Sequence, residues 1–159
     1  CLLAFRGRHR TVMTPGRYTE LFFLDEAVAL AAGHRPCAEC RRADYTGFRT
    51  AFGQVNGRPA SAADIDGTLH AARVIPRSRT QLTHEAHAQD LPDGVFVRLD
   101  DAAWLVQGAR LLRYAPGGYT MARPRPKGRL VVLTPAPTVA ALAAGYAPKL
   151  HESAQAVGF

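Results

Sequence analysis

Two cysteines three positions apart, Cys37 and Cys40, form the pattern with the clearest chemical meaning in this chain. Two thiolates at this spacing can bind one ion across a tight turn, which is half of the ligand set of a structural zinc site. The same spacing occurs in redox dithiols and in buried cysteines that do no chemistry. A redox pair is expected to open a helix directly after a strand, whereas this pair follows a predicted helix that stops at Gly33 and Pro36. We therefore expect Cys37 and Cys40 to bind Zn²⁺.

Residues 21–42, which read LFFLDEAVALAAGHRPCAECRR, resemble the second half of the Ada-type metal-binding module. That family has an aromatic strand, a short helix with an acidic cap, the motif Ala-Gly-aromatic-Arg-Pro-Cys-x-x-Cys, and basic residues after it. The resemblance implies a zinc site, held in the family by four cysteines, and DNA binding. A related form of the module is an accessory metal-binding segment of secreted nucleases, which implies a purely structural ion. The family's first cysteine pair would precede Cys37, where this chain has only Cys1, so methyl transfer to a cysteine is not expected.

Tetrahedral zinc needs two donors beyond the pair, and the closed site that results holds a structural ion. Cys1 heads an apolar run that reads as a strand, and its thiolate is the third predicted ligand. His84 is the fourth, because His84 and His87 have the spacing of a metal-binding pair if this segment is helical; two solvated imidazoles on a surface helix are the alternative. His34 is expected to pack rather than to bind the ion. The other histidines considered are His9, His70 and His151.

The net charge of +7 arises from 18 Arg and 2 Lys against 13 acidic residues. Such a surface attracts polyanions, and the guanidinium group forks onto phosphate oxygens. Arginine-heavy usage together with many Ala, Gly and Pro would equally follow from a GC-rich genome. Charge alone therefore leaves nucleic-acid binding and genome composition as alternatives.

The arginines expected to meet phosphates lie on either side of the predicted helix. If residues 6–10 are extended, Arg6, Arg8 and Arg10 share one face of a hairpin strand and can contact a phosphate backbone together. A turn centred on Gly7 with solvated charges is the alternative for the first group, and pairing with Asp44 or water is the alternative for the second. The two groups are Arg6, Arg8 and Arg10 before the helix, and Arg41 and Arg42 after it.

Two further segments are basic. Residues 77–80 form a polar, basic connector that leads to His84. Residues 123–129, RPRPKGR, form a loop stiffened by proline that could hold a phosphate backbone, with a solvated hairpin loop as the alternative.

The spacing of apolar residues and turn signals predicts an α+β fold. After a predicted strand at residues 20–24, helices are expected over residues 25–32, with Asp25 as cap, over 42–52, with Tyr45, Phe48 and Phe52 as a buried stripe, and over 62–74. From residue 91, short apolar runs between turns predict an antiparallel meander or small barrel. A C-terminal helix near residues 139–144 repeats the Ala-rich helix and Gly stop of residues 27–36.

The chain divides into a predicted zinc-binding module (residues 1–58), a helical connector (59–90) and an antiparallel β subdomain with the C-terminal helix (91–159), with one compact domain as the alternative. No run of ~20 apolar residues and no signal peptide is present. Three cysteines do not make a disulfide framework, so we expect a cytoplasmic protein. Because Cys1 opens the sequence without a Met, we expect that an N-terminal piece is missing and carries further ligands.

These features predict a cytoplasmic bacterial protein with a structural zinc that binds nucleic acid, with DNA as the expected partner. The second hypothesis is an enzyme that acts on a phosphate-containing or nucleobase substrate, with His70, Arg73 and His84 in one cleft. The third is a zinc-stabilised protein-interaction module. Membrane association is not expected, and the oligomeric state is not predicted.

Overall fold

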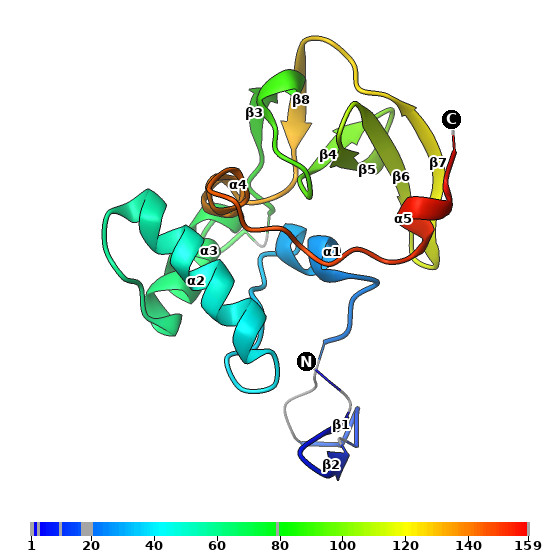
Figure 1. Ribbon diagram of the computed structural model, residues 1–159. Coiled ribbons are helices and arrows are strands. Elements are labelled where there is room, and N and C mark those ends of the chain that lie inside the picture. Colours follow the sequence, from blue (N-terminus) through cyan, green and yellow to red (C-terminus); the bar gives the residue numbers. More distant parts are fainter. Residues whose placement is uncertain (1, 3, 10, 17–20, 79, 159) are drawn as a thin grey trace.

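The computed structural model describes residues 2, 4–9, 11–16, 21–78 and 80–158, and within them the protein combines helices with one large open sheet (Figure 1). The sheet is antiparallel and has the strand order β3-β8-β4-β5-β6-β7. The predicted α+β class is therefore confirmed. None of the helices in the described part of the chain has both the length and the apolar character needed to cross a bilayer.

Four strands follow one another as the predicted meander, and a fifth returns to the start of the sheet. The turns suit tight hairpins because Asp100 and Asp101 between β4 and β5, and Gly108 between β5 and β6, have positive φ. Strand β8 then pairs with both β4 and β3, which leaves β3 and β7 as the edges. The strands are β3 His84–His87, β4 Phe96–Leu99, β5 Ala102–Gln107, β6 Arg110–Ala115, β7 Gly118–Pro124 and β8 Arg129–Val132.

The predicted helices are present; α1 begins after its predicted cap Asp25, whereas α4 begins three residues before the predicted start of the C-terminal helix. Asp25 Oδ1 accepts the Val28 amide at the start of α1, and Ser61 and Asp64 form a capping box at the start of α3. Helix α2 runs four residues beyond its predicted end, through Gly53. The helices are α1 Glu26–Ala31, α2 Arg42–Asn56, α3 Ala62–Arg73, α4 Ala136–Ala143 and the short α5 Ser153–Ala156, with a 3-10 turn η1 at Ala88–Asp90.

Both faces of the sheet are covered. Successive residues of a strand point to opposite sides, so each strand contributes to two different cores. Val97 and Val106 belong to a core shared with the buried faces of α2, α3 and α4, whereas their neighbours Phe96 and Leu105 belong to a second core with Ala27 of α1 and Ala154 of α5. The first core thus joins residues of the predicted zinc-binding module to the sheet. The proposed division into three segments stays a prediction.

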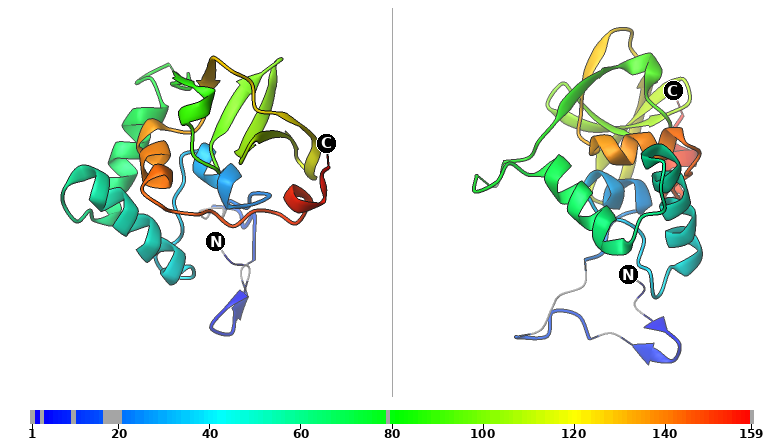
Figure 2. Two further views of the ribbon diagram at one scale, coloured as in Figure 1. Left: turned by 45° about the horizontal axis from the view of Figure 1, so that its top comes forward. Right: turned by 90° about the vertical axis from the view of Figure 1, so that its left-hand side faces the viewer.

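Two local predictions were wrong, and one alternative is confirmed. Residues 21–24 form no strand, and residue 20 lies outside the described residues. His84–His87 is the edge strand β3 rather than a helix, so the side chains of His84 and His87 point to opposite faces. Arg6 and Gly7 form a positive-φ turn between β1 (Ala4–Phe5) and β2 (Arg8–His9), so Arg6 and Arg8 do not share one strand and the alternative of a turn centred on Gly7 is confirmed. Figure 2 shows this N-terminal hairpin standing away from the helices and the sheet.

Candidate functional site

The two cysteines lie on the loop between α1 and α2. Gly33, in the left-handed conformation with φ of 81°, ends α1 as predicted, and the Arg41 amide donates to the Cys37 carbonyl at 3.1 Å to start the turn into α2. Cys40 is buried and Cys37 is half-buried, and both are free thiols. The amide of Leu2 donates to Cys40 Sγ at 3.4 Å, so the N-terminal segment touches the pair.

The loop stabilises the thiolate form of Cys37. Burial raises the pKa of this thiol, but the backbone amides of Cys40 and Glu39 and the Cys40 thiol all bond to its sulfur and together lower the pKa below its usual value. The thiolate is the form that binds a metal. The lowered pKa of Cys37 therefore favours the protonation state that a metal ligand needs.

The remaining predicted ligands do not join the pair within the described residues. No three His, Cys, Asp or Glu side chains of the described part of the chain gather so that they could hold a metal ion. His84 lies on edge strand β3 and does not gather with the two cysteines in the described part of the chain, so His84 as a ligand stays a prediction without support from the structure. Cys1 lies outside the described residues. His34 stacks at a tilt against Phe23, with ring centroids 5.2 Å apart, as a packing residue does.

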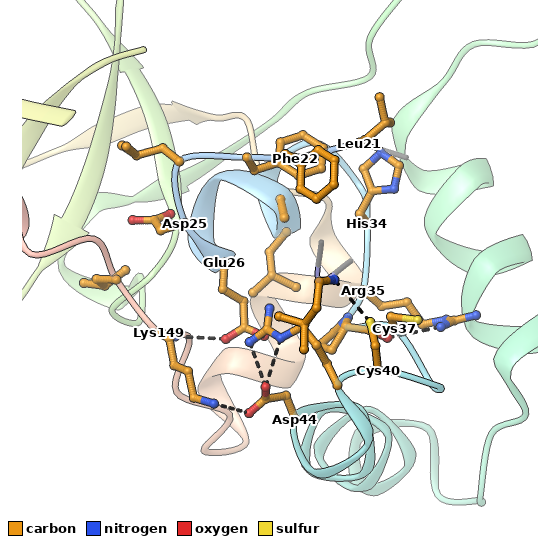
Figure 3. Close-up of a pocket in the computed structure, with 18 of the residues that line it drawn as sticks. Leu21, Phe22, Asp25, Glu26, His34, Arg35, Cys37, Cys40, Asp44 and Lys149 are labelled. Atoms are coloured by element: carbon orange, nitrogen blue, oxygen red, sulfur yellow. Dashed lines mark hydrogen bonds and ion pairs between the residues drawn. The ribbon is translucent and has the colours of Figure 1, made fainter. Parts of the chain in front are cut away.

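An open cavity of about 1030 Å³ adjoins the pair and is bounded by α1, the cysteine loop and residues 149–151 (Figure 3). Its charged lining is balanced rather than basic. The acidic residues are Asp25, Glu26, Asp44 and Asp66, and the basic ones are Arg35, Arg41, Arg42 and Lys149. Such a lining by itself does not select an anion.

The most buried charge in the cavity wall is Glu26, which is 5% exposed. Its carboxylate accepts the Tyr146 hydroxyl at 2.6 Å and the Lys149 amide at 2.9 Å, and Arg41 lies 3.2 Å away. Arg41 also pairs with Asp44 at 2.7 Å, and Lys149 Nζ donates to Asp44 at 2.8 Å. A buried carboxylate needs such partners to remain charged. This cluster holds α1, α2 and the C-terminal segment together.

A second cluster surrounds Asp25. Its Oδ2 accepts the Tyr119 hydroxyl at 2.7 Å and the His151 amide at 3.1 Å, while Oδ1 caps α1. Ser153 Oγ accepts the Tyr119 amide at 2.9 Å and lies 2.9 Å from His151 Nδ1. These bonds tie α1 to β7 and to the turn before α5, which is a structural role.

The predicted phosphate contacts are only partly available. Arg41 is paired with Glu26 and Asp44, so the alternative of pairing with Asp44 is confirmed, and its contact with phosphate stays a prediction. Arg42 donates to the Ala38 carbonyl at 3.4 Å and lies over the Tyr45 ring. Arg6 is exposed and lies over the Phe5 ring, 5.1 Å from its centroid. The side chain of Arg8 and all of Arg10 lie outside the described residues.

Two of the four basic residues at positions 123–129 are paired with carboxylates, and a third donates to the backbone. Arg123 pairs with Asp100 at 2.7 Å and Arg129 with Glu85 at 3.2 Å, and Arg125 donates to the Leu91 carbonyl. These bonds fold the loop back onto the sheet.

The hypothetical catalytic group consists of His70, Arg73 and His84. None of these described residues lines the cavity. His70 is exposed on α3, and Arg73 crosses over Gly33, where an added Cβ would lie 2.4 Å from Arg73 Cδ. Burial, and the charge of Arg73, lower the pKa of His34. Arg73 therefore packs against Gly33 at the end of α1.

Sequence reasoning missed the two buried clusters around Asp25 and Glu26. The available signal was the Asp-Glu pair at a helix start, which was assigned only a capping role.

Comparison of the chain with models of protein families, with curated proteins and with solved structures finds no match.

Proposed function

We propose that this chain is a nucleic-acid-binding protein whose N-terminal segment is fixed by a structural zinc ion. The observation that carries the proposal is the contact of the Leu2 amide with Cys40 Sγ at 3.4 Å. It brings the residue that follows Cys1 in the sequence against the pair of thiols. The lowered pKa of Cys37 supports the same proposal, because a zinc ligand must be deprotonated.

Cys37, Cys40 and Cys1 are the proposed thiolate ligands. Cys1 and Glu20 are the residues outside the described part of the chain that carry zinc-donor side chains. A reducing, cytoplasmic compartment would keep the thiols free to bind the ion. When bound, the ion would hold the start of the N-terminal segment against the loop that precedes α2.

Nucleic acid is the proposed partner because the segment fixed by the ion is basic. The first 19 residues contain Arg6, Arg8, Arg10 and Arg17 and no acidic residue. Arg6 sits at the exposed tip of a hairpin that projects from the body. Arginines on an exposed hairpin can release counterions from a phosphate backbone.

The test measures metal content and nucleic-acid binding on the same samples. We expect close to one zinc per chain by plasma mass spectrometry, and loss of the metal in Cys37→Ala and in Cys1→Ala. His84→Ala is the matched control and should keep the metal. Binding to a fluorescent DNA duplex should weaken steeply with salt, and Arg8→Ala should weaken all sequences alike.

The outcomes separate the hypotheses. A zinc-free protein with full stability would refute the metal site. Zinc retention without salt-dependent binding would favour the zinc-stabilised protein-interaction module. The enzyme hypothesis is not carried further, because no described observation favours it.

A further inference from the structure

A second basic hairpin leaves the body of the protein between α3 and β3. Its described residues are 74–78, 80 and 81, with a bridge between Val74 and Gln81 and a hydrogen bond from the Ile75 amide to the Thr80 carbonyl at 3.0 Å. The Leu82 amide donates to the Arg73 carbonyl, which closes its base. Both views of Figure 2 show this green segment extending away from the helices and the sheet. It is therefore a narrow two-stranded ribbon accessible from solvent.

The charge of this ribbon is positive and uncompensated. No Asp or Glu occurs from Gly67 to Thr83. Arg77 lies at the tip, is exposed, and makes no hydrogen bond or ion pair with the residues that the structure describes. In contrast, Arg123 and Arg129 of the other basic loop are paired with carboxylates. Arg77 is thus free to meet a ligand's negative charge.

The ribbon also exposes apolar side chains next to that charge. Ile75 is 39% exposed, Leu82 is 37% exposed, and Pro76 is exposed between Ile75 and Arg77. A single-stranded ligand would be held by aromatic stacking, but residues 74–81 contain no aromatic side chain. Proteins that enter the minor groove of DNA use arginine together with exposed apolar residues such as isoleucine, leucine or proline. In such complexes the arginine meets the negative potential of the groove, and the apolar residue packs against or between base steps.

We infer that the described part of this hairpin, residues 74–78, 80 and 81, is a minor-groove contact for duplex DNA, with Arg77 as the charged contact and Ile75 and Pro76 as the apolar one. This inference rests on the proposed nucleic-acid binding and adds a second contact, separate from the N-terminal hairpin. It also specifies the partner as a duplex.

The test compares Arg77→Asn with Arg113→Asn by fluorescence anisotropy on short duplexes. Asn tolerates the left-handed conformation that Arg77 has, with φ of 66°, so the hairpin should keep its fold. One lost phosphate contact lowers the magnitude of the slope of log K against log salt by about 0.9, which is about a fivefold loss of affinity at about 0.15 M salt. Arg113 is an exposed arginine on β6 without a described partner, and its variant should bind like the unaltered chain.

Two further measurements identify the groove. Ile75→Ser should weaken binding at every salt concentration without changing the slope, because it removes an apolar contact. Netropsin, which occupies the minor groove of A·T-rich DNA, should compete with the unaltered chain and much less with Arg77→Asn. Thermal melts of each variant establish that the fold is kept.

The outcomes separate this inference from the proposed function. DNA binding that is unchanged in both Arg77→Asn and Ile75→Ser, or that is indifferent to netropsin, would overturn the inference and leave the proposed function standing. Tighter binding to single strands than to duplex would also overturn it. Absence of nucleic-acid binding by the unaltered chain would overturn both.

Discussion

The hydroxyl of Tyr146 offers a direct test of how the buried Glu26 carboxylate is held. Tyr146→Phe removes only the 2.6 Å hydrogen bond to Glu26, because the ring keeps its edge-on contact with Phe48 at 5.2 Å between centroids. The carboxylate retains the Lys149 amide and Arg41. The variant therefore isolates one of three partners of a buried charge.

The expected loss in the free energy of unfolding follows from the type of bond. Hydrogen bonds to charged groups contribute about 1.5–3 kcal/mol, and Tyr146 is only half-buried, so we expect about 1.5–2 kcal/mol at neutral pH. Glu26→Ala should cost about 3–5 kcal/mol, since it leaves Arg41 with one partner fewer and two donors without an acceptor. Once Glu26 is gone, Tyr146→Phe should cost almost nothing further, because its hydroxyl no longer has this partner.

Urea unfolding followed by the fluorescence of Trp104, the single tryptophan, measures these values. Tyr45→Phe is the matched control: Tyr45 is buried, but its hydroxyl makes no hydrogen bond among the described residues, so its removal should change stability by less than about 0.5 kcal/mol. A similarly small effect of Tyr146→Phe, or full additivity with Glu26→Ala, would refute the assigned network.

Three other perturbations have defined outcomes. Gly33→Ala should destabilise the protein by about 1–2 kcal/mol, because φ is 81° and the added Cβ would lie 2.4 Å from Arg73 Cδ; Gly67→Ala, inside α3 with open space around it, should instead stabilise by up to about 1 kcal/mol, and equal denaturation midpoints for the two variants would contradict this. Burial, and the bonds to Asp25 and Glu26, raise the pKa values of Tyr119 and Tyr146, so only the unfolded chain loses these protons near pH 10. The contribution of these two tyrosines to the free energy of unfolding should be complete below that pH. Above it, the free energy of unfolding should fall by up to about 1.4 kcal/mol per pH unit for each tyrosine, and an equally steep fall in the two Phe variants would exclude this cause. A strong zinc chelator should lower the thermal midpoint of the unaltered chain but not that of Cys37→Ala, and equal shifts would speak against the proposed metal.

The sequence predicted the elements that local chemistry determines. Asp25 caps α1, and Gly33 ends it, because each role depends on a few neighbouring residues. The meander was equally predictable, since short apolar runs alternate with turn residues. Residues 84–87 were misread because a short segment with two histidines has no clear period, and pairing with β8 decides its structure.

The contacts of the site were harder to predict because they join distant residues. Tyr146 and Glu26 are 120 positions apart, and no local pattern marks them as partners. Arg41 was read as a phosphate contact from its charge, although two carboxylates in the folded protein take it up. That Cys37 and Cys40 lie on one loop could be predicted from their spacing alone. Further zinc ligands depend on which distant residues the fold places beside that loop, so the zinc ligands stay predictions.

The bonds from residues 149 and 151 to the start of α1 have a consequence for biosynthesis. A helix of six residues is too short to persist in water without tertiary partners. Its carboxylates find theirs only after Lys149 and His151 have left the ribosome. The helix before the cysteine loop therefore gains these partners only once synthesis has passed His151, and the proposed zinc ion could bind the thiols before that point.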